Sequence, residues 1–141
     1  MGKNSAEEHY KRSFMENAGL QVCSVLSEIA WQDVNRLAKN DILVSSSDQL
    51  YRSACSVSAN ISEGYSRKSK LDQARFYEYA LGSARECRGW YYNSRHELPE
   101  EILKSRLALL TQIIKLLLKI VSNTRNVRIK EPEVDLCRVI C

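Results

Sequence analysis

The sequence contains few of the residues that form turns and end helices. Its 141 residues include only five glycines and two prolines, too few for the many turns of a β-sandwich or β-barrel. No apolar run reaches the roughly 18 residues of a membrane-spanning helix, and the N-terminus MGKNSAEEHYKR lacks the apolar centre of a signal peptide. The hydrophobic fraction of 44% is typical of globular chains. The composition therefore predicts an all-helical, single-domain, cytoplasmic protein.

Residue sets for catalysis or metal binding are also missing. The two histidines lie near predicted helix ends, and neither completes the Glu-x-x-His motif of di-iron helix bundles. The glycines are isolated, so the sequence has no phosphate-binding loop. The five cysteines include no CxxC pair, and Cys137 and Cys141 have no nearby histidine to complete a zinc site. We therefore expect free thiols, no metal or cofactor, and no enzyme activity.

Apolar residues recur at helical spacing in four segments. The predicted helices cover residues 14–39, 46–64, 71–94 and 99–123. Short connections between helices of this length are typical of an antiparallel up-down-up-down four-helix bundle. We therefore expect a bundle domain over residues 14–125, a flexible N-terminus over residues 1–13 and a C-terminal tail over residues 126–141.

Particular residues mark the predicted boundaries. The apolar stretch 42–44 is expected to be an extended connection, and Ser46 followed by Gln49 is a capping-box pattern that starts the second helix. Gly64 is expected to end that helix in a left-handed cap, because glycine has no Cβ to oppose it. Pro99 is expected at the first position of the fourth helix.

The third predicted helix carries one stripe that is expected to face the core. The stripe comprises Phe76, Ala80, Ser83, Cys87 and Trp90. Gly82 and Gly89 lie inside the same helix, where each costs about 1 kcal/mol relative to alanine. We expect close packing against a neighbouring helix to compensate for both.

The fourth predicted helix is the most apolar of the four. One seam comprises Leu103, Leu107, Leu110, Ile114, Leu117 and Val121. A second seam, one residue away, comprises Ile102, Leu109, Ile113, Leu116 and Ile120, with Arg106 in the remaining place. Two adjacent seams make a face wider than one bundle interior needs, which favours burial against a second copy of the chain. The alternative is a wide core face within a single bundle.

Polar residues on the second and third predicted helices form a set at helical spacing. The set comprises Asn60, Glu63, Gly64, Gly82, Ser83 and Glu86. We interpret it as a structural polar layer in which Asn60 and Glu63 bond across to Ser83 and to the backbone of the third helix. Gly82 would allow the two backbones to approach. The alternative is an acid–base pair of Glu63 and Glu86, although no histidine or metal set accompanies it.

These residues also carry a family resemblance. The segment from Arg52 to Gly64, RSACSVSANISEG, resembles the R-x-A-x-S-(I/V)-x-x-N-I-x-E-G signature of the 23S rRNA-intervening-sequence proteins. The segment from Phe76 to Glu86, FYEYALGSARE, is similar to the F-L-x-I-A-x-G-S-x-x-E motif of the same family. The two motifs lie at the family's spacing, and the helix lengths fit the family over about residues 15–123.

The resemblance implies more than the residues show by themselves. It implies a four-helix bundle that assembles as a homopentameric barrel with a basic surface or channel. It also implies kinship to the accessory variability determinant of diversity-generating retroelements, a similar pentamer that binds the element's reverse transcriptase and nucleic acid. It supplies no catalytic residues.

The charges are distributed unevenly along the chain. The net charge is −2 over residues 1–50, +8 over residues 51–130 and −2 over residues 131–141. A basic middle between acidic ends favours an anionic partner surface. The alternative is a set of ordinary solvated helix faces.

Residues 102–130 contain seven basic groups and no acidic one. Lys104, Lys115 and Lys119 share one helical face opposite the apolar seams, because eleven residues make about three turns. The candidate nucleic-acid-binding residues are Lys104, Lys115, Lys119, Arg125, Arg128, Lys130, Arg67, Lys68 and Lys70. The aromatic run 90–92 is a candidate for base stacking, with a core or interface contact as the alternative.

The sequence therefore favours two hypotheses about function over a third, an enzyme that uses the carboxylates of Glu63 and Glu86. The first is a non-enzymatic homo-oligomeric adaptor, with a pentamer favoured, that binds RNA or an RNA–DNA hybrid electrostatically as the partner of a reverse transcriptase. The second is a protein-binding assembly module, encoded in an rRNA insertion, without affinity for nucleic acid.

Overall fold

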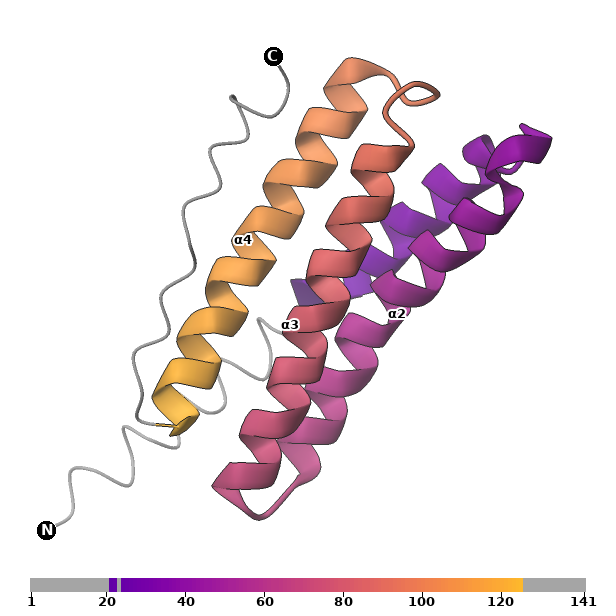
Figure 1. Ribbon diagram of the computed structural model, residues 1–141. Coiled ribbons are helices and arrows are strands. Elements are labelled where there is room, and N and C mark those ends of the chain that lie inside the picture. Colours follow the sequence, from indigo (N-terminus) through magenta and orange to yellow (C-terminus); the bar gives the residue numbers. More distant parts are fainter. Residues whose placement is uncertain (1–20, 23, 126–141) are drawn as a thin grey trace, which may run out of the picture.

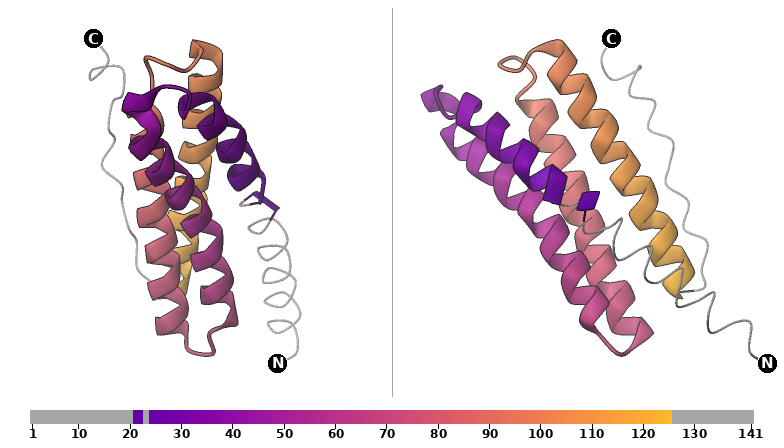
Figure 2. Two further views of the ribbon diagram at one scale, coloured as in Figure 1. Left: turned by 90° about the vertical axis from the view of Figure 1, so that its right-hand side faces the viewer. Right: turned by 180° about the vertical axis from the view of Figure 1, so that it is seen from behind.

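The computed structural model describes residues 21–22 and 24–125 (Figure 1). Residues 21–22 and 24–37 are helical and belong to the first helix. The elements after it are the 3₁₀ turn η1 (Asp41–Leu43) and the helices α2 (Val44–Ser66), α3 (Lys70–Asn93) and α4 (Glu100–Arg125). Successive helices run in opposite directions (Figure 2). The described residues contain four long helices and no strand, which confirms the all-α fold class and fits the predicted four-helix bundle.

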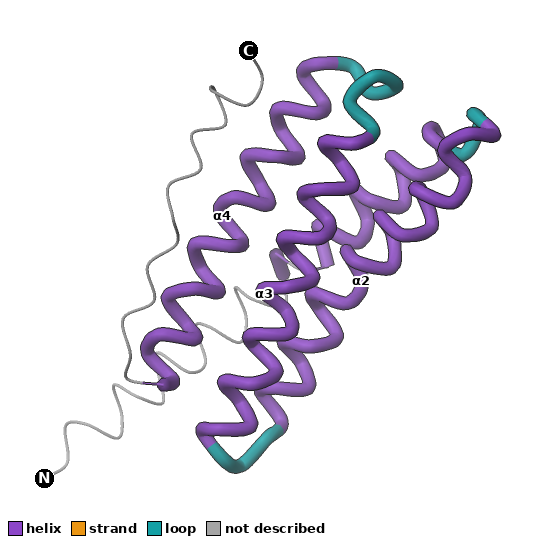
Figure 3. Tube along the Cα trace, in the orientation of Figure 1, coloured by secondary structure: helices purple, strands orange, loops and turns teal. Residues whose placement is uncertain are grey.

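The connections between the helices are short (Figure 3). Ser69 caps α3, because its hydroxyl accepts a hydrogen bond of 3.3 Å from the backbone N–H of Asp72. Such a side-chain cap satisfies one of the backbone N–H groups that have no partner within the helix. The predicted flexible N-terminus 1–13 and the tail 126–141 lie outside the described residues.

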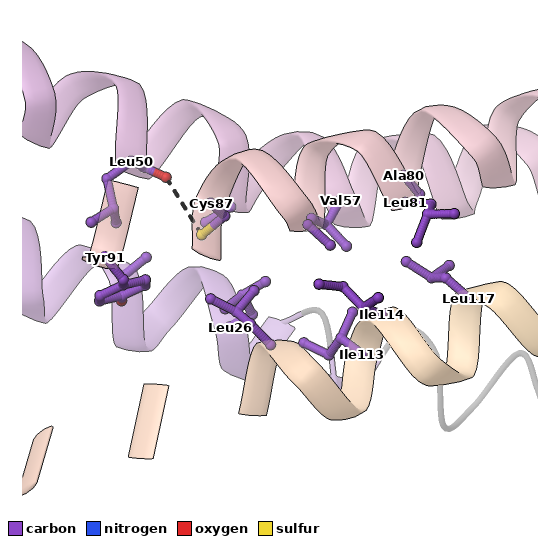
Figure 4. Close-up of a cluster of buried hydrophobic side chains, with 14 of the residues drawn as sticks. Leu26, Leu50, Val57, Ala80, Leu81, Cys87, Tyr91, Ile113, Ile114 and Leu117 are labelled. Carbon is purple, nitrogen blue, oxygen red and sulfur yellow. Dashed lines mark hydrogen bonds between the residues drawn. The ribbon is translucent and has the colours of Figure 1, made fainter. Parts of the chain in front are cut away.

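The core is a column of mostly aliphatic side chains, with Tyr91 among them (Figure 4). The helix α3 packs against both α2 and α4. Fully buried large side chains come from all four helices and include Leu26, Leu50, Val57, Ile114, Leu117 and Tyr91. Burial of one such aliphatic side chain contributes roughly 1.5–3 kcal/mol, so this column is the main source of the subunit's stability.

The start of α2 differs from the prediction. Residues 42–44 are not extended, because the side chain of Asn40 accepts a hydrogen bond of 3.1 Å from the backbone N–H of Ile42 and caps the turn η1. The turn runs directly into α2, whose N-cap Leu43 makes no side-chain cap bond. The capping box expected at Ser46 is therefore wrong, since Ser46 already lies inside the helix.

Gly64 has a different role from the one expected. It does not adopt the left-handed conformation, and α2 continues past it to Ser66. It is instead a point of close approach between α2 and α3: a Cβ placed on Gly64 would lie 2.8 Å from Cε1 of Tyr77 and 3.1 Å from Cβ of Phe76. The backbone of α2 fits against these side chains because glycine has no side chain there.

The face that α3 turns to the core is rotated from the predicted stripe. Ala80 and Cys87 are buried as expected, but Phe76, Ser83 and Trp90 are only partly buried. The other buried residues of the helix are Ala74, Leu81, Ala84 and Tyr91. Tyrosines and tryptophan occur on several sides of this helix, so apolar spacing alone does not fix its orientation. Gly82 and Gly89 are exposed with no atom near the missing Cβ, so the close packing expected there is absent.

The helix α4 buries parts of both predicted seams. Its buried residues are Leu110, Ile113, Ile114, Leu117, Leu118 and Val121. Other seam residues, among them Leu103, Leu109 and Ile120, are partly buried against the core. Among the helices of the described residues, α4 is the one that is long and apolar enough to cross a membrane, by length and composition only. The core helix of a bundle has the same signature, and the apolar side of α4 packs against α3.

Candidate nucleic-acid interface

The polar layer predicted between the second and third helices is absent. Asn60 donates to the backbone carbonyl of Ser56 at 2.8 Å, and Ser83 donates to that of Tyr79 at 3.0 Å. Both bonds stay within their own helix, which is the usual way for short polar side chains to satisfy themselves. The predicted cross-helix bonds are therefore wrong, as is the expected close approach at Gly82.

The two carboxylates of the predicted set also bond locally. Glu63 forms an ion pair with Arg67 one turn later. Glu86 accepts a hydrogen bond of 3.3 Å from the indole N–H of Trp90. Both bonds lie on exposed sides of their helices, so neither carboxylate is held in the interior of the bundle.

A different polar cluster lies in the interior. Asp33 of the first helix is only 3% exposed and accepts hydrogen bonds from two other helices. The hydroxyl of Tyr91 donates to Oδ2 at 2.9 Å. Arg106 donates from Nε to Oδ2 at 2.7 Å and from Nη2 to Oδ1 at 3.3 Å. This Asp33 cluster therefore joins the first helix to α3 and α4.

The cluster shifts the titration of its members. Burial, together with the neighbouring carboxylate of Asp33, raises the pKa of the Tyr91 hydroxyl well above its usual value of 10.0. The hydrogen bond to Asp33 raises the pKa of the Arg106 guanidinium. Both shifts favour the neutral phenol and the charged guanidinium that the observed bonds require.

The sequence contained a signal for the Asp33 cluster. Arg106 interrupts an otherwise apolar seam, and Asp33 lies three residues after Ala30 and four before Leu37, which are both buried. A charged residue on an apolar face needs a buried partner of opposite charge. The spacing does not say which acid pairs with Arg106, because the two residues are 73 positions apart.

The outer face of α4 carries three of the candidate basic residues. Lys104, Lys115 and Lys119 are all exposed, as the helical spacing predicts. Lys104 forms an ion pair of 2.6 Å with Glu100, which raises the pKa of the lysine and lowers that of the glutamate. Among the described residues, Lys115 and Lys119 have no ion-pair partner, so their charges are available to a ligand.

A second group of basic residues lies at the turn between α2 and α3. Arg67 is held by its ion pair with Glu63 and lies 4.8 Å from the centre of the Phe76 ring. Lys68 and Lys70 are exposed and have no ion-pair partner within the described part of the chain. The turn therefore presents two available ammonium groups beside a guanidinium that is already paired.

The C-terminal end of α4 lies at the same end of the bundle as this turn (Figures 1 and 2). Arg125 at that end pairs with Glu78 of α3, with Nε 2.6 Å from Oε1. Arg128 and Lys130 lie outside the described residues. Four candidates thus combine exposure with an available charge, and they are Lys68, Lys70, Lys115 and Lys119.

The aromatic run does not form a stacking surface. Tyr91 is fully buried in the core, and the Trp90 indole bonds to Glu86. The guanidinium of Arg95 lies 4.5 Å from the centre of the Tyr92 ring and covers it. This arrangement fits the alternative interpretation of the run as a packing feature.

The architecture and surface define a class of protein: an all-helical bundle with a buried ionic cluster and basic residues on one outer face. Comparison with known proteins gives the particular family. Residues 20–119 match the family described as 23S rRNA-intervening sequence protein, and the chain belongs to that family. This confirms the family identified from the two sequence motifs.

A solved structure is similar to the chain along most of its length. It is a protein of unknown function from the S23 ribosomal protein family of Bacteroides thetaiotaomicron, 26% identical, with a TM-score of 0.68. The alignment covers 72% of this chain and 96% of that one. No curated protein matches the chain.

Proposed function

We propose that the protein is a non-enzymatic, homo-oligomeric adaptor that binds RNA or an RNA–DNA hybrid through the outer face of α4. The observation that carries the proposal is the pair Lys115 and Lys119, exposed one turn apart on a stretch of α4 that has no acidic residue after Glu101. Such a surface attracts phosphate backbones without reading sequence.

The proposed assembly strengthens this surface. A homopentamer would repeat the two lysines around a ring, and repeated charges of one sign produce a stronger field than one subunit does. Family membership supports this part of the proposal, since the sequence resemblance implies a pentameric barrel. The same kinship leads us to propose a reverse transcriptase as the protein partner, in the cytoplasm.

The decisive experiment measures binding to a fluorescent RNA hairpin over a salt series. We expect affinity to fall steeply between about 50 and 200 mM salt, because bound phosphates release counterions. The variant with Lys115→Glu and Lys119→Glu should bind much more weakly. Its plot of log affinity against log salt should lose about two units of slope, roughly one for each lost phosphate contact.

The matched control is the variant with Arg36→Glu and Lys39→Glu. It carries the same change of net charge at exposed positions of the first helix and the turn after it. Unchanged binding in this control, with weak binding in the α4 variant, places the interface on α4. Equal losses in both variants, or no loss in either, would show that the proposed interface is wrong.

A specific observation favours a second candidate, a protein-binding assembly module. Three of the candidate basic residues already pair with carboxylates of the same chain, namely Lys104, Arg67 and Arg125. Basic residues that pair with carboxylates of their own chain can also pair with acidic side chains of a partner protein. Purified protein that ignores RNA at low salt but binds an acidic partner protein would support this second candidate.

A further inference from the structure

On the outer face of α3, two large apolar residues stay exposed in the part of the chain that the structure describes. Leu71 is 67% exposed and Tyr79 is 48% exposed on this face. Gly82 follows Tyr79 by three residues, and apart from its chain neighbours and the adjacent helix backbone no atom lies within 4 Å of the position that a Cβ would occupy there. Figure 1 shows α3 with its outer side free of the other described helices. An apolar face beside open glycine backbone is a surface that another helix can approach closely.

Two charged residues of this face have opposite signs and lie at nearly the same helical angle. Arg75 and Glu86 are eleven residues apart, so they lie about three turns from each other on one side of α3. Both are exposed. Arg75 donates to the hydroxyl of Tyr79 at 2.9 Å, and Glu86 accepts from Trp90. The described residues supply no salt bridge to either one.

The sequence of this face complements itself when it is read in reverse. If two α3 helices lie antiparallel with Arg75 opposite Glu86, then Tyr79 lies opposite Gly82 and Leu71 opposite Trp90. The large tyrosine thus meets the open glycine, and the exposed leucine meets an aromatic ring. Every pair occurs twice, because a two-fold axis exchanges the two copies.

We propose that the outer face of α3 binds the same face of a second copy of the chain in this antiparallel register. The charges select the arrangement. A parallel pair would place Arg75 against Arg75 and Glu86 against Glu86, with like charges in contact. A shift of one heptad would separate Arg75 from Glu86 of the second copy by about 10 Å along the axis.

This contact is separate from the proposed nucleic-acid interface, which lies on α4. It is also separate from the contacts that would close a ring of subunits, since an isologous contact pairs two copies and does not form a ring. If the subunits form pentamers through other faces, the α3 contact joins two pentamers. Failure of the α3 contact would therefore leave RNA binding by α4 untouched, and the reverse also holds.

The first test exchanges the two charges. Arg75→Glu and Glu86→Arg should each halve the mass measured by sedimentation equilibrium, because each creates two like-charge contacts. The double variant, with both changes, should restore the wild-type mass. Arg36→Glu, the same charge change at an exposed position of the first helix, should leave the mass unchanged. Wild-type mass in both single variants, or a wild-type protein that stays monomeric, would overturn the proposal.

The second test measures the register by oxidation to disulfides. In the proposed register residue 82 lies about 4.5 Å along the axis from its copy, and residue 89 lies about 25 Å from its copy. A disulfide needs Cα atoms within about 7 Å. Gly82→Cys should therefore give a covalent dimer, whereas Gly89→Cys, the same change on the same face, should match the wild type. Cross-linking of both variants would indicate a parallel pair, and cross-linking of neither would exclude the contact.

Discussion

Removal of the buried carboxylate of Asp33 should strongly destabilise the bundle. In the variant Asp33→Ala, the guanidinium of Arg106 and the hydroxyl of Tyr91 both lose their acceptor. Loss of one member of a buried ion pair costs about 3–5 kcal/mol, because a charge stays buried without its partner. The Arg106 side chain is 17% exposed and can reach some water, so we expect about 3 kcal/mol, at the low end of that range.

Urea unfolding at a fixed protein concentration measures this loss. With a urea dependence of about 1.5 kcal/mol per M, the midpoint should fall by about 2 M. The variant that replaces all three partners, with Asp33→Leu, Arg106→Leu and Tyr91→Phe, should be more stable than Asp33→Ala, because it buries no unpaired polar group.

The comparison between these two variants decides whether the cluster acts as a unit. If the Asp33→Ala variant unfolds at the wild-type urea concentration, the carboxylate does not stabilise the fold. If the triple variant is less stable than Asp33→Ala, the main loss comes from packing volume and not from unpaired polar groups. Either result would refute the assignment of Asp33 as the ionic link between three helices.

Three further predictions concern single positions. Gly64→Ala should destabilise the subunit by about 1–3 kcal/mol in urea unfolding, because a Cβ would meet Tyr77 at 2.8 Å. Gly89→Ala, on open helix surface, should stabilise the subunit by about 1 kcal/mol. Equal effects of the two substitutions would contradict both assignments. Burial raises the pKa of the Cys87 thiol to about 12, so mass spectrometry after alkylation at pH 8 should find Cys87 unmodified in folded protein and modified in urea. Burial also raises the pKa of Tyr91, so the folded state keeps a proton that the unfolded chain releases near pH 10.0. The protonated Tyr91 hydroxyl therefore stabilises the fold fully below pH 10.0, and this stabilisation is lost as the pH rises above that value. Above pH 10.0, a plot of unfolding free energy against pH should be flatter for Tyr91→Phe than for the wild type. Parallel plots would contradict the raised pKa.

Much of the fold could be predicted from the spacing of apolar residues. The predicted third helix, 71–94, and the observed α3, Lys70–Asn93, differ by one residue at each end. Spacing succeeds here because each helix has one apolar side that must face the core. It fails at the start of α2. The side chain of Asn40 caps the turn η1, so helical structure begins earlier than the capping-box pattern at Ser46 indicates.

The candidate site could be predicted only in part. Exposure of Lys115 and Lys119 followed from helical geometry, but the polar layer did not form, because Asn60 and Ser83 each found an acceptor in their own helix. A short polar side chain in a helix always has such a carbonyl within reach. A set of polar residues at helical spacing therefore does not by itself predict bonds between helices.

The basic residues of α4 show that the side of the helix on which a residue lies decides whether it stabilises the bundle or is available to a partner. Lys104 and Arg106 are two positions apart, which places them about 200° from each other around the helix axis. Lys104 is therefore exposed beside Glu100, and Arg106 turns inward to Asp33. Lys115 lies within about 20° of Lys104 and points outward as well. The same helix thus supplies one cation that holds the bundle together and others that are available to a partner, so substitutions at Arg106 should reduce stability while substitutions at Lys115 should change binding alone.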